Sequence, residues 1–388
     1  MKDTTISNNI IYIGEDDKDL DLFESQYIVP NGVSYNSYVI IDKKIAIMET
    51  IDKRKTKEWF ENLERALNGR TPDYLVISHL EPDHAYNIGS VIEKYPNIKL
   101  VGNCRTFSLL PQFFNIADLE TRKVEVKEGD VLDLGTHKLH FIMAPMVHWP
   151  EVMMEYEECE KILFSADGFG KFGTLDTDED WDCEARRYYF NIVGKYGMQV
   201  QDVLKKASTL DIQTICPLHG PILKENLAHY IEKYNIWSKY ETESEGVFIA
   251  CASIHGNTLN VCNKLKEILE SKGAKKVVLT DLSREDWAEA VEDSFRYGKI
   301  VFASATYNME IFSPMRDLLL NLKEKNYQNK KVALIENGTW APNSAKCMKN
   351  IIETMKNIEI VEPIVTIKST LKNEDIYKLE QLADEILK

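Results

Sequence analysis

The amino-acid sequence predicts two α/β domains in series, and three observations support this. At 388 residues the chain exceeds the size of one ordinary domain. Its first part predicts short strands interrupted by helices, as in two β-layers covered by helices on the outside. Its last part alternates strand and helix five times, which predicts a parallel, doubly wound sheet. The polar stretch 239–246 is the expected linker, so the predicted domains span residues 1–245 and 246–388.

Composition excludes several classes of function. A hydrophobic content of 44% with 28% charged residues is typical of a soluble globular protein, and a net charge of −15 argues against a nucleic-acid surface. No apolar run is long enough for a membrane span, and the start of the chain has no signal-peptide core. The seven cysteines form no C-x-x-C pair, which indicates reduced thiols in the cytoplasm and no built-in iron–sulfur module.

The predicted elements of the first domain begin with a hairpin. Residues 33–41 and 45–49 flank a polar turn and are typical of paired strands. An amphipathic helix follows over 53–67, then a strand at 74–77 and a helix from 87 to about 95. Further strands are expected at 99–102, 124–126, 131–134, 138–143, 161–165 and 213–216, with helices between about 180 and 209.

The predicted elements of the second domain are five strand–helix units. Each apolar run of four to nine residues precedes a longer amphipathic segment. The expected strands are 247–251, 276–279, 299–303, 331–335 and 359–367, and the expected helices are 258–271, 285–296, 313–325, 343–356 and 373–387.

Four residues that can bind metal follow the strand at 74–77. His79 and Glu81 alternate, so in an extended chain their side chains share a face and could bind one ion. A turn after Pro82 would direct Asp83 and His84 toward a second ion. The alternative is a polar loop that holds these residues by chance. Two ions need about three protein ligands each, so the rest of the chain has to supply more.

Three later motifs each place one more ligand at the end of a strand. His148 follows the strand at 138–143, Asp167 follows the strand at 161–165, and His219 follows the strand at 213–216. Each is flanked by glycine or proline, which favour tight turns. Taken singly, such a residue is more often a cap or a hydrogen-bonding group. Taken together with the first motif, they form a specific constellation.

This pattern resembles the metallo-β-lactamase superfamily, whose usual first motif is His-x-His-x-Asp-His. Here Glu81 stands at the second His position. Carboxylate is a harder ligand than imidazole, which shifts the preference from zinc toward iron. With the downstream strand–helix domain, the chain closely resembles the flavodiiron proteins over nearly its whole length. The resemblance implies an αββα metallo-β-lactamase-like sandwich followed by a flavodoxin-like domain.

By the same resemblance, the chain would hold a non-haem pair of irons. His79, Glu81 and His148 would bind one iron. Asp83, His84 and His219 would bind the other, and Asp167 would bridge the two irons. The remaining histidines match no ligand position and are interpreted as surface or structural residues: His137, His140, His229 and His255.

Three loops of the second domain are candidates for binding FMN. The first lies between a strand and a helix, where backbone N–H groups and the helix N-terminus suit a phosphate, and Gly256 permits close approach. The other two follow later strands and each carries an aromatic residue that could stack on the flavin. The predicted residues are Ser253, Ile254, His255, Gly256, Asn257, Thr258, Ser304, Ala305, Thr306, Tyr307, Asn308, Asn337, Gly338, Thr339 and Trp340.

The resemblance implies reduction of dioxygen to water, of nitric oxide to nitrous oxide, or both, with electrons from FMN. It also implies an external donor such as rubredoxin, and a head-to-tail homodimer or a tetramer in which FMN of one subunit serves the irons of another. Trp149 and one of three tyrosines (Tyr188, Tyr189 and Tyr196) are expected near the irons. The alternatives are a zinc hydrolase with a flavodoxin-like regulatory domain and a non-catalytic electron carrier. The sequence leaves open the preferred gas, the donor and the oligomeric state.

Overall fold

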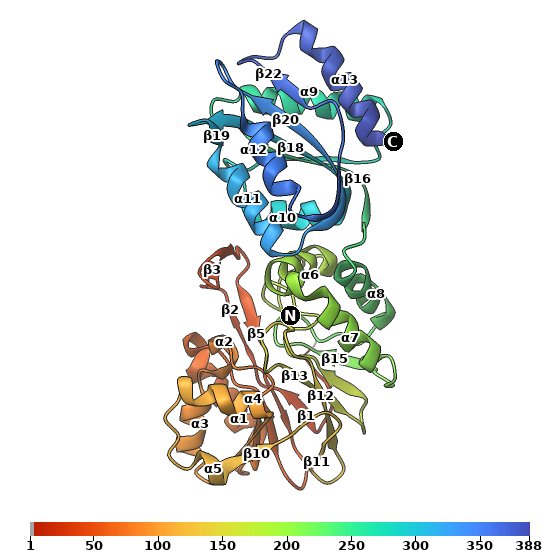
Figure 1. Ribbon diagram of the computed structural model, residues 1–388. Helices are drawn as coiled ribbons and strands as arrows, with labels where there is room; N and C mark the ends of the chain where they lie inside the picture. Colours follow the sequence, from red (N-terminus) through yellow and green to blue (C-terminus); the bar gives the residue numbers. More distant parts are fainter. Residues whose placement is uncertain (1–3) are drawn as a thin grey trace. The chain divides into compact units, whose positions relative to one another are not determined.

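A computed structural model describes residues 4–388 and divides the chain into two compact units (Figure 1). The first unit extends to Tyr189 and includes Tyr196–Asn235; the second comprises Phe190–Lys195 and Ile236–Lys388. The expected linker at 239–246 needs correction, because its last residues already form the first strand of the second unit, which begins at Ser244. Among residues 4–388, no helix is both long and apolar enough to cross a membrane.

The first unit contains two facing sheets. The six-stranded sheet has the order β1 (Ile10–Tyr12), β6 (Tyr38–Ile40), β7 (Ala46–Met48), β8 (Tyr74–Val76), β9 (Lys99–Gly102) and β10 (Lys123–Glu125). The five-stranded sheet has the order β11 (Val131–Asp133), β12 (Lys138–Met143), β13 (Met153–Glu157), β14 (Ile162–Phe164) and β15 (Thr214–Cys216). Two short ribbons pair β2 (Glu15–Asp17) with β5 (Val33–Tyr35) and β3 (Leu22–Phe23) with β4 (Tyr27–Ile28).

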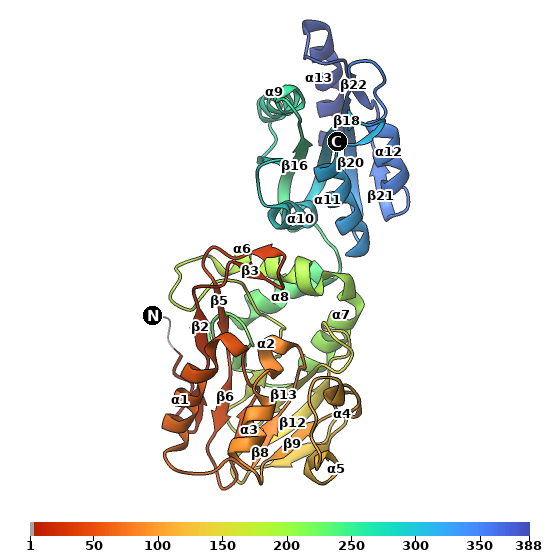
Figure 2. The same cartoon turned by 90° about the vertical axis from the view of Figure 1, so that its left-hand side faces the viewer.

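The core of this unit lies between the two sheets. Ile40 and Val76 of the first sheet and Phe141 and Phe164 of the second belong to one cluster of buried side chains. Helices cover the outer faces, with α1, α3 and α4 on one side and α7 on the other (Figures 1 and 2). The predicted αββα sandwich is therefore confirmed. Its helices are α1 (Thr56–Leu67), α2 (Pro82–Ala85), α3 (Ile88–Lys94), α4 (Cys104–Leu109), α5 (Leu119–Arg122), α6 (Trp181–Tyr188) and α7 (Gly197–Ala207), and α8 (Leu227–Ser238) crosses the division between the units.

The second unit is built on one parallel sheet. Its order is β17 (Val277–Asp281), β16 (Ser244–Ala252), β18 (Tyr297–Tyr307), β20 (Gln328–Asn337) and β21 (Lys356–Ile360), with β22 (Val365–Ile367) also paired to β20 and β19 (Glu310–Ile311) to β18. The expected last strand is thus two short strands. The strand order reverses between β16 and β18, so ligands are expected at the carboxyl ends of these strands.

Helices cover both faces of this sheet, and the predicted doubly wound fold is confirmed. Helices α9 (Asn257–Ser271) and α13 (Asn373–Leu387) pack together over one face, where Val247, Ile249, Leu265 and Leu382 belong to a single buried cluster. The other face is covered by α10 (Trp287–Arg296), α11 (Ser313–Glu324) and α12 (Ser344–Ile352). Burial on both faces explains why the central strands are continuous apolar runs.

Candidate metal centre and flavin pocket

The loop that carries the first metal-binding residues follows β8, and the buried side chain of Glu49 holds its backbone in place. Glu49 accepts hydrogen bonds from the backbone N–H groups of His79 and of the residue before it. Pro82 then begins helix α2, a position where its missing N–H costs no hydrogen bond. Asp83 and His84 lie on this short helix, so the motif supplies ligands both from extended chain and from a helical turn.

The structure brings four of the predicted residues into a first group. His79 Nε2 lies 3.3 Å from a carboxylate oxygen of Glu81 and 3.3 Å from Asp167 Oδ2. His148 Nε2 lies 3.1 Å from the same Glu81 oxygen and 3.2 Å from Asp167 Oδ2. Two imidazoles and two carboxylates therefore converge on one point.

The other predicted residues form a second group beside the first. His84 Nε2 and His219 Nε2 lie 3.4 and 3.3 Å from Asp83 Oδ2. The same two nitrogens lie 3.3 and 3.7 Å from Asp167 Oδ1. One oxygen of Asp167 thus faces each group, which is the arrangement expected of a carboxylate that bridges two metal ions.

Several buried polar atoms of this cluster lack hydrogen bonds. Within residues 4–388, neither carboxylate oxygen of Asp83 or Asp167, neither ring nitrogen of His84, nor Nε2 of His219 makes one. Such groups are rare in proteins, because each unpartnered buried atom costs free energy. Two cations would supply the missing partners. A set of four imidazoles and three carboxylates without a thiolate fits iron.

The pKa values of residues in this cluster follow from the short distances between imidazole nitrogens and carboxylate oxygens. Burial acts to lower the pKa of His148, but Asp167 and Glu81 outweigh it and raise the pKa to about 9. Burial acts to raise the pKa of Asp167, but the imidazoles of His148 and His84 outweigh it and hold that pKa well below its usual range. Without metal, His148 is therefore protonated at neutral pH and Asp167 is ionised. A bound metal would displace the proton of the imidazole.

Further groups that the sequence reasoning missed orient the imidazoles. Glu151 Oε1 lies 2.9 Å from His79 Nδ1 and accepts the backbone N–H of Leu80 at 3.0 Å. The carbonyl oxygen of Ser34 lies 2.8 Å from His219 Nδ1. Acceptors on the far ring nitrogen fix the tautomer and leave Nε2 free for metal. Glu151 could have been found as the carboxylate three residues after His148, whereas Ser34 carries no sequence signal.

Aromatic rings enclose the two groups. Of the three tyrosines considered, Tyr188 lies beside the centre, with its ring centroid 5.7 Å from that of His219. The ring of Tyr189 packs against Tyr234 instead. The expected neighbour Trp149 lies edge-on to His79, with ring centroids 5.2 Å apart.

The β3–β4 ribbon also reaches this site. Its turn places Glu24 and the following residue at φ of 49° and 58°, an uncommon pair of left-handed positions for residues other than glycine. The turn carries Phe23 against His219, with ring centroids 5.3 Å apart. Desolvation and the charge of Glu81 raise the pKa of Glu24 to about 7, although its side chain remains partly exposed. The sequence contains no pattern that identifies Glu24.

The three predicted flavin loops line one cavity of about 440 Å³ in the second unit. Thirteen of the fifteen predicted residues line it, together with Met309, Ala341 and Ser369. The other two contribute differently: Gly256 is the N-cap of α9 at φ 84°, and Ser304 is buried beneath the loop. A Cβ on Gly256 would meet open space, so its left-handed backbone, rather than crowding, favours glycine there.

The geometry of this cavity fits a flavin phosphate and ring. Ser253 Oγ is buried without a hydrogen bond within the described chain, next to the N-terminus of the fifteen-residue helix α9. Such a hydroxyl and helix terminus suit a phosphate group. Asn337 links the loops by donating to Thr258 at 3.4 Å and to the carbonyl of Ser369 at 2.9 Å. Trp340 remains 88% exposed, as expected of a ring that awaits a stacking partner.

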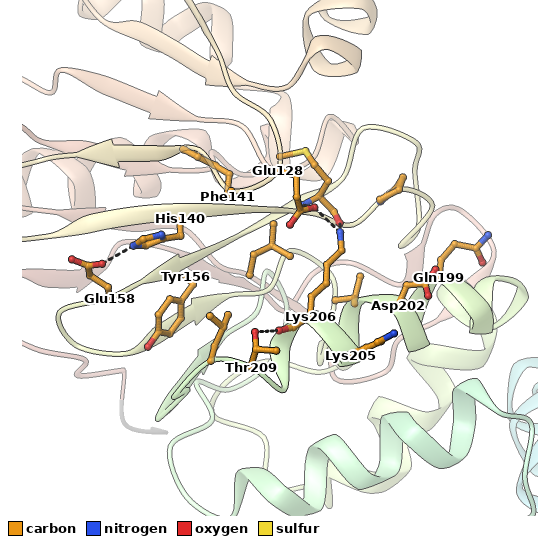
Figure 3. A pocket seen from close by; sticks show the side chains of 16 residues that line it. Glu128, His140, Phe141, Tyr156, Glu158, Gln199, Asp202, Lys205, Lys206 and Thr209 are labelled. Carbon is orange, nitrogen blue, oxygen red and sulfur yellow. Dashed lines mark hydrogen bonds and ion pairs between the residues drawn. The ribbon is translucent and has the colours of Figure 1, made fainter.

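A larger cavity of about 830 Å³ lies in the first unit along β12 and α7 (Figure 3). None of the predicted site residues lines it. Two pairs of the side chains drawn at its rim contact each other, His140 with Glu158 and Lys206 with Glu128 (Figure 3). Its walls are mainly apolar, and we assign it no role in the chemistry.

Comparisons with known proteins show which families and structures this chain resembles. A family model described as the ODP family beta lactamase matches residues 33–220. An uncharacterized protein of Methanocaldococcus jannaschii is 32% identical over 291 residues, 72% of each chain. The nitric oxide reductase of Moorella thermoacetica is 28% identical over 395 residues, 98% of this chain and 97% of its own. The solved rubredoxin oxygen:oxidoreductase of Desulfovibrio gigas shares the fold with a TM-score of 0.92 at 24% identity, covering 99% of this chain and 97% of that one.

Proposed function

This chain belongs to the flavodiiron protein family, and from that premise we propose that it reduces dioxygen to water, nitric oxide to nitrous oxide, or both. It is an oxidoreductase with a non-haem diiron centre and FMN. One relative carries the name nitric oxide reductase, and a structural neighbour is named an oxygen oxidoreductase. The single observation that carries the proposal is Asp167, whose two oxygens face two separate groups of ligands.

We assign the ligands as the geometry groups them. His79, Glu81 and His148 would hold one iron and Asp83, His84 and His219 the other, with Asp167 between the two groups. When bound, the irons and FMN would supply the electrons for reduction of the gas. Glu151 and the carbonyl of Ser34 keep two of the imidazoles in the tautomer that binds metal.

The surrounding side chains control access of water and protons. The rings of Phe23, Tyr188 and Trp149 pack against the ligand imidazoles and exclude water from them. Glu24, an exposed carboxyl on the turn between β3 and β4, lies at the edge of this site and would exchange protons between the site and solvent.

The predicted FMN residues in loops 253–258, 304–308 and 337–340 bind the cofactor in this proposal. Support comes from the buried, unpartnered Ser253 hydroxyl at the N-terminus of α9 and from the aromatic residues at the cavity mouth. The alternative zinc hydrolase needs neither a flavin cavity nor a carboxylate in place of the second histidine, so this function is less well supported.

We also propose the assembly and setting of the enzyme. The domains are residues 1–245 and 246–388, and the chain forms a head-to-tail homodimer or a tetramer. A small redox protein similar to rubredoxin supplies electrons, as the name of the Desulfovibrio gigas protein suggests for that relative. The scattered, unpaired cysteines support a cytoplasmic location. A fully active monomer, measured by light scattering at assay concentration, would contradict the dimer.

Stopped-flow mixing tests the function. The protein is purified without oxygen, analysed for metal and flavin, reduced, and mixed separately with dioxygen and with nitric oxide. We expect two irons and one FMN per chain and rapid flavin reoxidation by at least one gas. Zinc in place of iron, with hydrolytic activity and no gas turnover, would overturn the proposal.

A further inference from the structure

A second buried imidazole in the first unit lies between carboxylates in the same way as a ligand of the metal centre. His137 is 1% exposed; its Nδ1 lies 2.9 Å from Asp42 Oδ2 and its Nε2 lies 3.2 Å from Glu160 Oε1. For His79 the corresponding distances are 2.9 Å to Glu151 and 3.3 Å to Glu81. The sequence suggests only a structural role for His137.

The register of the second sheet brings a thiol to this imidazole. Strands β12 and β13 are antiparallel with Leu139 paired to Glu157, so continuing the register places His137 opposite Cys159. The N–H of Glu158 donates to the carbonyl of Lys138 at 3.1 Å, which confirms that the pairing continues beyond the strands. His137 and Cys159, twenty-two positions apart in the sequence, therefore meet at one end of the sheet.

The turn after β13 presents three donor groups to one point. A ring nitrogen of His137, a carboxylate oxygen of Glu157 and Cys159 Sγ all lie within 4.8 Å of one another. Glu157 is buried and is oriented by the backbone N–H groups of Cys159 and Glu160, at 2.9 and 2.7 Å. Hydrogen bonds of this kind commonly hold carboxylates that bind metal. Cys159 is exposed, which gives an ion a route of entry.

We propose that His137, Glu157 and Cys159 form a separate site for a zinc-type divalent cation, with Glu160 beside His137 as a further carboxylate. Imidazole, thiolate and carboxylate are the ligands of zinc, and the thiolate distinguishes this site from the iron centre. Asp42 acts as the positioning residue, because it accepts Nδ1–H and so directs the lone pair of Nε2 toward the ion. The bound ion would fasten the turn before β12 to the turn after β13.

Binding exchanges protons for metal. The thiol of Cys159 and the imidazolium of His137 each release one proton to solvent as their bonds to the cation form. Desolvation and the carboxylates of Glu157 and Glu160 raise the pKa of Cys159, so the free site holds a thiol. Asp42 and Glu160 outweigh burial and raise the pKa of His137. The same carboxylates attract the cation that replaces these protons.

Cobalt is a suitable probe, because a thiolate bound to Co²⁺ gives a charge-transfer absorption that the cysteine-free iron centre cannot give. Full-length, metal-loaded, reduced protein is titrated with Co²⁺ alone, and difference spectra are recorded. We expect a thiolate band that saturates at one equivalent, is lost in Cys159→Ser, and persists in the matched control Cys104→Ser, which removes another exposed thiol. Asp42→Asn should weaken binding about 10- to 100-fold while keeping the band.

Alkylation provides a second readout in the unmodified chain. Zn²⁺ should slow the reaction of Cys159 with iodoacetamide and leave Cys104 unaffected, as measured by peptide mass spectrometry. Absence of the cobalt band in the wild type would overturn the proposal. A band that survives Cys159→Ser would also overturn it, as would equal protection of both thiols by zinc. These outcomes are independent of gas turnover, so they do not depend on the proposed function.

Discussion

The metal cluster and the flavin cavity differ in how much of each site the protein completes by itself. His79, His84 and Asp167 are at most 1% exposed, and hydrogen bonds to Glu49 and Glu151 fix His79 before any metal binds. In the flavin cavity, Trp340 is 88% and Tyr307 51% exposed, and much of the wall is loop. The first site is thus preorganised around charges that need a cation, whereas the second is completed when the flavin covers its aromatic residues. A substitution in the metal cluster should therefore remove nearly all of its function, whereas a substitution in the flavin cavity should weaken flavin binding only in part.

The largest effect is expected from Asp167→Asn. The amide supplies only one oxygen and no negative charge, so both groups of ligands lose their shared partner. We expect gas reduction to fall by more than about 100-fold, since altering even an outer partner of a ligand commonly costs 10- to 100-fold. FMN content should not change. The control Asp211→Asn removes an exposed carboxylate that pairs with Lys161, and normal iron content is expected there.

Glu151→Gln tests whether the metal cluster depends on its supporting hydrogen bonds. The amide oxygen can still accept the N–H of Leu80, but it lacks the charge that stabilises the His79 imidazole in its metal-binding form. Iron affinity, measured by competition with a chelator, should fall about 10- to 100-fold. Glu125→Gln changes an exposed strand residue of the same unit and serves as control. Unchanged affinity in Glu151→Gln would contradict the orienting role.

Trp340→Ala tests the graded behaviour of the flavin cavity. Loss of one stacking ring costs about 1 to 1.5 kcal/mol, which corresponds to a fivefold to tenfold weaker FMN affinity. Fluorescence titration of the apo-protein measures this change, and iron content should stay constant. Tyr377→Ala removes an exposed aromatic residue of the same unit outside the cavity. An equal loss in both variants would contradict the assignment of Trp340.

The two units should also respond oppositely to pH, and Glu49→Gln tests the first. Burial raises the pKa of Glu49 to about 8. Between pH 4.5 and 8 Glu49 therefore keeps its proton in the folded state and loses it in the unfolded state, so the contribution of this group to stability falls as pH rises, by about 1.4 kcal/mol per pH unit. In metal-free protein, calorimetry should show this slope reduced in the variant. An unchanged slope would mean that Glu49 is ionised in the folded protein.

Lys330→Met tests the second unit, where the sign reverses. Burial lowers the pKa of Lys330 to about 7. Between pH 7 and 10.5 the unfolded state binds more protons, so stability rises with pH in the wild type. The variant should lose this rise. The carbonyl of Phe295 loses its donor in the variant, which shifts stability at every pH but leaves the slope as the readout.

Much of both sites is predictable because residues that can bind metal or flavin directly follow the apolar runs that predict strands. His148, Asp167 and His219 each follow an apolar run that is typical of a buried strand. Strands β14 and β15 are parallel neighbours, so their ends lie together, and β12 ends at the same edge because β13 is antiparallel to both β12 and β14. The positions of Glu24 and Ser34 are not predictable, because a short ribbon and a backbone carbonyl carry no residue pattern. The choice of Tyr188 over its neighbours also needed the packing around His219.

Among the elements that the sequence does not predict, β13 and α8 are missed for identifiable reasons. Strand β13 contains Glu155 and Glu157, which read as exposed residues but are buried. Ser78 donates to Glu155, and burial together with the charge of Glu49 raises the pKa of Glu155, so this carboxyl is neutral. Helix α8 buries aromatic residues, Tyr234 and Trp237, in place of an aliphatic stripe. In both cases tertiary contacts override the local pattern.

Diffraction at the iron absorption edge, from crystals grown without oxygen, tests the central claim most directly. We predict two anomalous peaks in each chain, about 3.5 to 4 Å apart, one on either side of Asp167. The first peak should lie among His79, Glu81 and His148, and the second among Asp83, His84 and His219. A single peak, or peaks at the zinc edge alone, would contradict a diiron centre bridged by Asp167.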